Sequence, residues 1–287
     1  MNLARFPRRR YTPHATPIEP MPRLSAELGG AELFIKRDDL LGLTAGGNKT
    51  RKLEFLVADA LTKGADTLIT VGAVQSNHCR LTLAAAVKEG LKCRLVLEER
   101  VAKSYNPDAS GNNFLFKLLG AENVTVVEGG ADTHAAMEAQ ADEVRVAGRV
   151  PYIIPGGGSN ATGALGYVSC AEEILQQSFD MGLSFDRVVC SSGSGGTHAG
   201  LATGMVGNSA NIPVTGISTR AESQPQEEKL HKLANATAEL LEINSIPREA
   251  FQVHDDYVGP GYSLPTDRKS TRLNSSHFTQ SRMPSSA

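Results

Sequence analysis

The feature of this 287-residue chain that most constrains its fold is a regular alternation of short apolar runs with segments of helical periodicity. The apolar runs have the length and composition of buried strands. They span residues 67–72, 93–97, 124–127, 152–154, 187–190 and 214–217. The helical segments between them span residues 75–88, 111–119, 131–146, about 160–177 and 197–205. Alternation of this kind with short connections predicts an α/β protein with doubly wound, mainly parallel sheets.

The two ends of the chain do not follow this pattern. Residues 1–30 contain five prolines after position 6, which favours an irregular lead-in, and residues 31–37 alternate as a strand does. Residues 268–287 are rich in serine, contain four basic residues and no acidic ones, and break the periodicity. We interpret this tail as a non-native-looking segment that resembles translated adapter or vector sequence, with a disordered natural tail as the alternative.

Composition excludes several classes of function. The net charge of -2 gives no basic surface for nucleic acid or an anionic membrane, and no apolar run is long enough to cross a bilayer. Four cysteines lie far apart, without a CxxC pair or the spacing of a metal site. We therefore expect reduced thiols, a cytoplasmic location and no bound metal.

The first candidate site is the lysine segment, residues 45–52, which reads Ala-Gly-Gly-Asn-Lys-Thr-Arg-Lys. It places Lys49 at the start of an amphipathic helix, where the helix dipole and partial desolvation lower the pKa of an amine. A neutral amine at this position is a candidate nucleophile. The alternative is a solvated basic cluster of Lys49, Arg51 and Lys52.

Two further segments lie between a predicted strand and a predicted helix, where α/β proteins bind ligands. The serine segment, residues 75–80, offers the Ser76 hydroxyl and free backbone N–H groups to a carboxylate, or Ser76 merely caps a helix. The glycine segment, residues 191–200, can direct successive N–H groups at a phosphate, or it is a turn without a ligand. It lacks the Gly-Lys-Ser/Thr of a nucleotide triphosphate loop, and His198 stands where a dinucleotide motif needs glycine.

A nucleophilic lysine and a separate phosphate-binding turn in one α/β protein together indicate pyridoxal 5′-phosphate. The lysine forms a Schiff base with the cofactor, and the turn holds the phosphate.

The lysine segment, Gln75-Ser76-Asn77-His78 and Gly193-Ser194-Gly195-Gly196-Thr197 resemble, in this order, the D-cysteine desulfhydrase and 1-aminocyclopropane-1-carboxylate deaminase family. The resemblance covers about residues 5–267. It implies the tryptophan synthase β-like fold, type II among pyridoxal phosphate enzymes. It also implies two domains: a discontinuous large cofactor domain of residues 1–52 and 158–267, and a small domain of residues 53–157.

The resemblance also assigns roles to single residues. Lys49 forms the Schiff base, Asn77 bonds the hydroxyl of the cofactor ring, and Ser76 holds the substrate carboxylate together with neighbouring groups of Asn77 and His78. Tyr262 matches an active-site tyrosine of the family. The cofactor phosphate is held by Gly193, Ser194, Gly195, Gly196 and Thr197.

The chain departs from the family after residue 267. Family members continue with a second active-site tyrosine, a glycine-rich turn near the pyridine nitrogen and further sheet elements. Here the tail of residues 268–287 follows instead, so we expect a C-terminally truncated large domain without its partner for the pyridine nitrogen.

The resemblance predicts a lyase that acts on a small amino acid. His78-Cys79 favours a D-cysteine desulfhydrase, which forms pyruvate, hydrogen sulfide and ammonia. The alternatives are a 1-aminocyclopropane-1-carboxylate deaminase, a cysteate-type sulfo-lyase, and a truncated chain that binds the cofactor without turnover. A homodimer is suggested by the resemblance alone.

Overall fold

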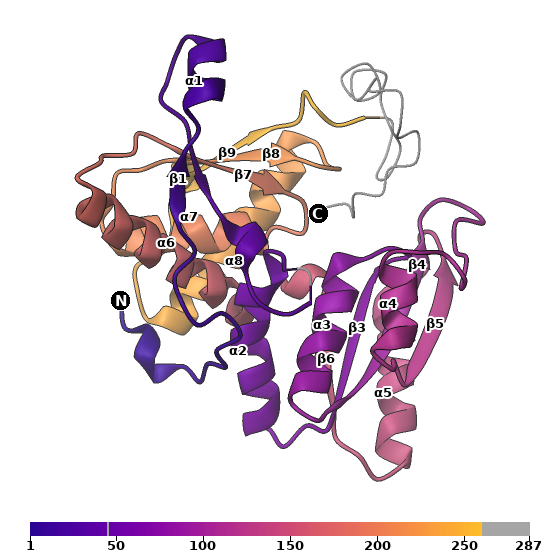
Figure 1. Ribbon diagram of the computed structural model, residues 1–287. Coiled ribbons are helices and arrows are strands. Elements are labelled where there is room, and N and C mark those ends of the chain that lie inside the picture. Colours follow the sequence, from indigo (N-terminus) through magenta and orange to yellow (C-terminus); the bar gives the residue numbers. More distant parts are fainter. Residues whose placement is uncertain (45, 260–287) are drawn as a thin grey trace.

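The computed structural model describes residues 1–44 and 46–259, which form two α/β lobes, each built on a parallel sheet (Figure 1). Tyr262 and the tail of residues 268–287 lie outside the described residues. Within the described part of the chain, none of the helices combines the length and the hydropathy of a membrane span.

The first lobe carries the four-stranded sheet, in the order β5-β4-β3-β6, and all of its pairs are parallel. Its strands are β3 (Thr67–Ala73), β4 (Lys92–Glu99), β5 (Asn123–Glu128) and β6 (Pro151–Ile154). The connecting helices are α3 (Asn77–Lys88), α4 (Asn112–Leu118) and α5 (Thr133–Val146). These bounds agree with the predicted elements to within two residues at each end.

The second lobe carries a parallel sheet in the order β7-β8-β9. Its strands are β7 (Val188–Ser192), β8 (Val214–Ser218) and β9 (Phe251–His254), and its helices are α6 (Ala161–Met181), α7 (Gly196–Gly207) and α8 (Ser223–Leu241). The predicted elements end at residue 217, so α8 and β9 were missed. The signal for α8 is present, because Leu230, Ala234, Ala238 and Leu241 are buried at helical spacing.

The prediction of an irregular lead-in was wrong for part of the first 30 residues. Strand β1 (Ile18–Pro20) pairs antiparallel with β2 (Phe34–Lys36), and α1 (Pro22–Leu28) lies between them. Pro22 occupies the first helical turn, where its missing N–H costs nothing, and Gly29 ends the helix in the left-handed conformation at φ 62°. The prolines here border secondary structure instead of preventing it. Figure 1 shows β1, α1 and β2 as an arm that projects from the second lobe.

Single 3₁₀ turns complete the described elements. They are η1 (Leu3–Arg5), η2 (Asp38–Leu40), η3 (Gly156–Gly158) and η4 (Arg248–Ala250).

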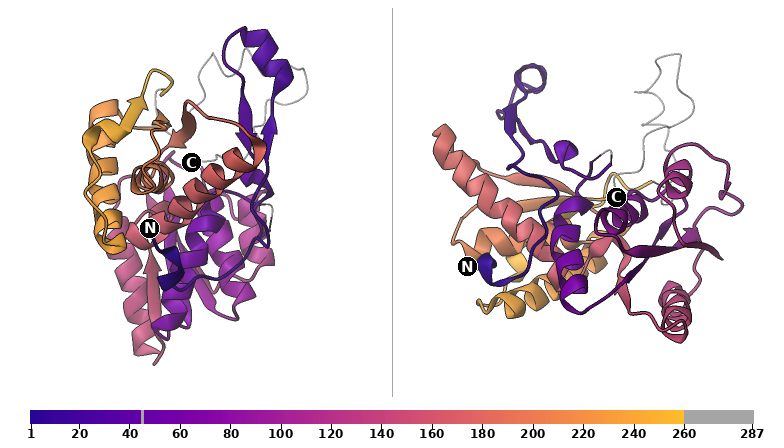
Figure 2. Two further views of the ribbon diagram at one scale, coloured as in Figure 1. Left: turned by 90° about the vertical axis from the view of Figure 1, so that its left-hand side faces the viewer. Right: turned by 60° about the horizontal axis from the view of Figure 1, so that its bottom comes forward.

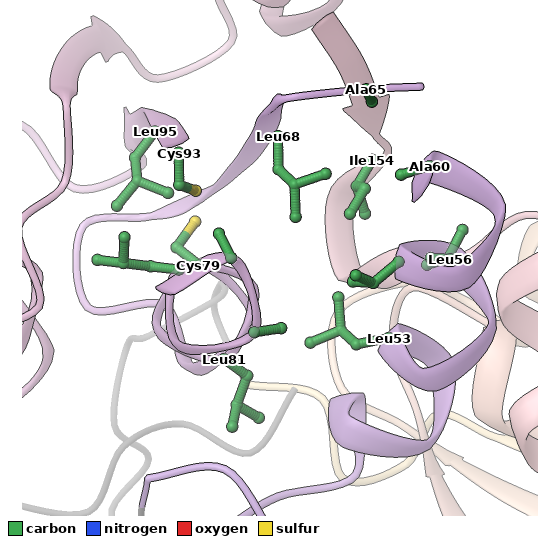
Figure 3. Close-up of a cluster of buried hydrophobic side chains, with 14 of the residues drawn as sticks. Leu53, Leu56, Ala60, Ala65, Leu68, Cys79, Leu81, Cys93, Leu95 and Ile154 are labelled. Carbon is green, nitrogen blue, oxygen red and sulfur yellow. The ribbon is translucent and has the colours of Figure 1, made fainter. Parts of the chain in front are cut away.

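Helix α2 (Lys49–Thr62) joins the two lobes and contributes to both cores. Leu53 and Leu56 face the four-stranded sheet and pack in one cluster with Leu68 and Ile154 (Figure 3). On another side of the helix, Phe55 packs in a separate cluster with Leu165 and Val168 of α6, and with Leu241 of α8. Because α2 is continuous through residues 52 and 53, the predicted domain boundary falls inside a helix, and the domain limits stay a prediction.

The contact between α2 and α6 requires a glycine. A Cβ atom at Gly166 would lie 2.3 Å from the carbonyl oxygen of Arg51, so any side chain there would push the two helices apart. The right-hand view in Figure 2 shows α2 in the middle of the molecule and α6 extending from it toward the edge of the second lobe.

A buried ion-pair network fixes the start of α2. Arg51 is 2 % exposed, and its guanidinium binds Asp38 at 2.8 Å and Glu173 of α6 at 2.8 Å. Burial raises the pKa of Asp38, but hydrogen bonds from Arg51, Tyr167 and Thr16 outweigh burial, and the net shift is downward. Both carboxylates are therefore ionised at neutral pH and depend on Arg51.

We predict that Arg51→Met destabilises the protein by about 3–5 kcal/mol at neutral pH, because it leaves two partly buried carboxylates without their cation. Arg37→Met is the matched control, since Arg37 pairs with Asp39 and Glu19, of which the side chains are 57 % and 46 % exposed. An exposed pair contributes about 0–1 kcal/mol. Urea unfolding followed by circular dichroism measures both changes. Equal midpoints for the two variants would contradict the importance of the Arg51 network.

Candidate functional site

Lys49 is the first residue of α2, as the sequence predicts, and its side chain is 2 % exposed. Burial lowers its pKa from 10.5 to about 8. Among the described residues no carboxylate lies within 4.0 Å of its amine, so nothing offsets the cost of the buried charge. A substantial fraction of this amine is therefore neutral near pH 8, which is the state that a nucleophile needs.

The alternative of a solvated basic cluster is wrong, because Lys49, Arg51 and Lys52 are all at most 2 % exposed. Lys52 lies one turn beyond Lys49, and its amine donates to the carbonyl oxygen of Gly157 at 3.0 Å. Burial and the neighbouring charges of Lys49 and Lys229 lower its pKa well below the usual value. Two lysines that have no acidic partner in the described part of the chain thus lie next to each other.

The glycine segment contains the N-terminus of helix α7 (Gly196–Gly207), which lies near Lys49 and Lys52. Helix α7 begins at Gly196, and its N-cap Gly195, at φ 98°, has no side chain with which to cap the helix. The N–H of Gly196 donates to the Ser159 hydroxyl at 3.1 Å. By contrast, Ser76 caps α3 and Asn160 caps α6 with hydrogen bonds to backbone N–H groups. No hydrogen bond from the N–H of Ser194 or Gly195 is found within residues 1–44 and 46–259. The uncapped end therefore offers N–H groups to an anion.

Asn48 connects the lysine segment to the glycine segment. Its side-chain amide donates to the Thr197 hydroxyl at 3.1 Å instead of capping α2. A cavity open to solvent lies between the two segments. Its lining consists of Asn48, Lys49, Ser191, Gly193, Ser194, Gly195 and Thr197. The structure therefore brings Lys49 and four of the five predicted phosphate-binding residues to one cavity, and Gly196 is not in its lining.

The serine segment is joined to the lysine segment through Arg80. The Arg80 guanidinium donates to the carbonyl oxygen of Gly46 at 3.1 Å and to the Asn77 side chain at 3.5 Å. The Ser76 hydroxyl accepts a hydrogen bond from the N–H of Cys79 at 3.2 Å and so caps α3. The capping role that the sequence offered as the alternative is present, and the role of Ser76 toward a substrate stays a prediction.

The His78 ring lies inside the first lobe. It is 2 % exposed, and its Nε2 lies 2.8 Å from the Thr70 hydroxyl. Burial and the charges of Lys49 and Lys52 lower its pKa to about 3, so the imidazole is neutral at physiological pH. Its predicted contact with substrate is untested, and Tyr262 lies outside the described residues.

Sequence reasoning missed several residues that line or support this cavity. Lys52 could have been found from the spacing of three residues that places it on the same helix face as Lys49. Asn48 and Ser159 give no local signal, because each acts on a segment distant in sequence. Ser159 accepts from the N–H of Gly196 at 3.1 Å and bonds Ser194 at 2.8 Å.

The donor set of the cavity fits the phosphate and the aldehyde of pyridoxal 5′-phosphate. The lining residues supply an amine, hydroxyls, an amide and backbone N–H groups, and no carboxylate is among them. Lys52 adds a second amine beside Gly196, since a Cβ atom at Gly196 would lie 2.9 Å from its Nζ. Within the described residues no group of histidine, cysteine and acidic side chains could hold a metal ion. The site is therefore built for an anion that also carries an electrophile.

Known structures share this architecture. A crystal structure of an ACC deaminase homologue superposes with a TM-score of 0.81 at 39% identity, covering 94% of this chain and 82% of that one. A threonine deaminase of T.th. matches with a TM-score of 0.54 at 24% identity, covering 72% of this chain and 60% of that one. The second likeness shows only the fold. The first, together with the parallel sheets, confirms the predicted α/β fold of type II.

Curated relatives cover most of the chain. The D-cysteine desulfhydrase of Klebsiella pneumoniae subsp. pneumoniae is 45% identical over 267 residues, which are 93% of this chain and 80% of that protein. The D-cysteine desulfhydrase of Yersinia enterocolitica serotype O:8 is 44% identical over 266 residues, or 92% of this chain and 79% of the relative. The sequence profile of the family described as pyridoxal-phosphate dependent enzyme matches residues 10–268. With its buried lysine, its uncapped helix end and this match over most of its length, the chain belongs to the pyridoxal-phosphate dependent enzymes.

Proposed function

We propose that this enzyme is a D-cysteine desulfhydrase, a carbon–sulfur lyase that converts D-cysteine to pyruvate, hydrogen sulfide and ammonia. The single observation that carries the proposal is the buried amine of Lys49, which has no acidic partner among the described residues, beside the free N–H groups that precede α7. This arrangement supports the cofactor chemistry, and the relatives at 44–45% identity support the substrate. The ACC deaminase homologue favours a second candidate, deamination of 1-aminocyclopropane-1-carboxylate.

When bound, pyridoxal phosphate supplies an aldehyde that condenses with an amine and a ring that accepts an electron pair from the substrate. Lys49 would carry the cofactor and, once a substrate amine has displaced it, its Nζ would take the α-proton. Proton removal at the α-carbon and departure of the β-thiolate, followed by addition of water, account for all the products.

The other residues bind and orient. We propose that Gly193, Ser194, Gly195, Gly196 and Thr197 hold the cofactor phosphate, together with Lys52, which was not among the predicted site residues. Asn77 would bond the ring hydroxyl, and Ser76 would hold the substrate carboxylate with the neighbouring groups of Asn77 and His78. Tyr262 stays a predicted active-site residue.

Location and assembly are proposals of the same kind. All four cysteines are free thiols, three of them buried, which is consistent with the cytoplasm that we propose. A homodimer is the assembly that the family resemblance suggests.

We predict that pyridoxal phosphate and borohydride leave a stable adduct on Lys49, found by mass spectrometry of peptides. Lys49→Ala abolishes the adduct because it removes the reactive amine. Lys63→Ala is the control: Lys63 follows the same helix, but its side chain is 62 % exposed and its variant retains full labelling. Labelling of Lys52 in place of Lys49 in the native protein would contradict the assignment.

The rate of this labelling should report the pKa of Lys49. Only the neutral amine attacks, so the rate rises about tenfold per pH unit below the pKa and levels off above it. With the pKa of Lys49 at about 8, the plateau begins near pH 8. Stopped-flow absorbance of the protein freed of cofactor measures the profile. A rate that still rises steadily to pH 10 would show an unperturbed lysine.

For the substrate, we predict release of pyruvate and sulfide in equal amounts from D-cysteine, and little 2-oxobutanoate from 1-aminocyclopropane-1-carboxylate. Lactate dehydrogenase coupling and a sulfide assay measure the first reaction. A preference for the cyclopropane substrate would support the deaminase instead. Labelling of Lys49 without either product would mean that this chain binds the cofactor without turnover.

A further inference from the structure

The carbonyl oxygen of Gly193 is held by two side chains of α8. Gln226 donates to it from Nε2 at 3.0 Å, and Lys229 donates from Nζ at 2.9 Å. A carbonyl oxygen has two lone pairs, so these two donors use its whole accepting capacity. Gln226 is 1 % exposed and Lys229 is half-buried, so both contacts are partly shielded from solvent.

This contact decides which way the next N–H group points. In a trans peptide the C=O and the following N–H point in opposite directions, and no peptide in the described chain is cis. Because the Gly193 oxygen faces α8, the N–H of Ser194 faces away from α8. Gly193 and Ser194 both line the cavity. A reversed peptide would present a carbonyl oxygen there and repel an anion.

The orientation of Gln226 is itself fixed by a chain of hydrogen bonds. His198 places Nε2 at 3.1 Å from the Val214 carbonyl oxygen, which can only accept, so its Nδ1 is an acceptor. Burial lowers the pKa of His198 to about 4, consistent with a neutral ring. Ser192 then donates to Nδ1 at 3.1 Å and accepts from Gln226 Nε2 at 3.0 Å. The amide of Gln226 therefore presents its NH₂ group, and not its oxygen, to the turn.

Lys229 also brings a charge that the described protein does not neutralise. None of the ion pairs between described residues includes it, and its ammonium lies behind Gly195, 3.9 Å from the position of a Cβ atom there. Burial and the nearby Arg220 lower its pKa to about 8, so it is mostly protonated at neutral pH. Lys52 lies next to Gly196, and the charge of Lys229 contributes to lowering the pKa of Lys52.

We propose that Gln226 and Lys229 are positioning residues for the cofactor phosphate: they hold the Gly193–Ser194 peptide with its N–H toward the phosphate, and Lys229 adds a positive charge behind the turn. The inference rests on the proposed placement of the phosphate at residues 193–197. It extends the site to α8, which contributes no residue to the cavity lining.

The test compares pyridoxal phosphate with pyridoxal, which has the same aldehyde and ring but no phosphate. Borohydride labelling of Lys49 over a concentration series gives an apparent affinity of the cofactor-free protein for each compound. We expect Lys229→Met and Gln226→Met each to weaken the apparent affinity for pyridoxal phosphate by about 10- to 100-fold. This is the range for loss of a charge-assisted or buried hydrogen bond. The apparent affinity for pyridoxal should change by less than about threefold in both variants. Lys229→Arg, which keeps the positive charge, should recover part of the affinity for pyridoxal phosphate that Lys229→Met loses.

Lys232→Met is the matched control, because Lys232 lies on the same helix, is exposed and makes no hydrogen bond or ion pair within residues 1–44 and 46–259. Equal weakening of both compounds would overturn the proposal, since it would mean a general structural effect on the site. Unchanged affinity for both would overturn it as well. Failure of the proposed function would look different, because the native protein itself would then show no labelling of Lys49.

Discussion

Burying a charge without a partner is costly, and helix α2 begins with three cationic side chains that water hardly reaches. Arg51 is compensated by Asp38 and Glu173, which tie the N-terminal segment and α6 to this helix. Lys49 and Lys52 have no such partners among the described residues, and the pKa of each is lowered. The positive charge that remains without an acidic partner at the start of α2 favours binding of an anion there.

The N-terminus of α7 meets the same need from the opposite side of the cavity. Gly195 leaves the helix without a side-chain cap, and Asn48 crosses from α2 to Thr197 instead of capping its own helix. Both helix ends thus lack the side-chain cap that α3, α5 and α6 have. Stability is given up where a ligand can restore it, so bound cofactor should contribute to the stability of the whole chain.

Much of this could be predicted from the sequence. The strand–helix alternation predicted the first lobe almost residue by residue, because its strands are short, mostly apolar runs, each preceded by a glycine. The start of α2 at Lys49 was predicted correctly for the same local reason. The strand predicted over residues 31–37 is present as β2, but β1, α1, α8 and β9 were not predicted, because prolines and polar residues obscured their periodicity. Burial of Arg51 could not be foreseen, since it depends on Asp38 and Glu173 from other parts of the chain. Asn48, Ser159 and Gln226 were missed for the same reason: their partners are distant in sequence.

Helix α2 belongs to two cores at once, through Leu53 and Leu56 on one side and Phe55 on another. If one lobe rotated against the other, the rotation axis would therefore have to run along this helix, because any other axis would break the packing of one of the two cores. Points on a rotation axis move least. Lys49, at the end of that axis, would keep its place while the serine segment of the first lobe approached or withdrew. The Lys49 amine would then stay in place whichever way the lobes turned.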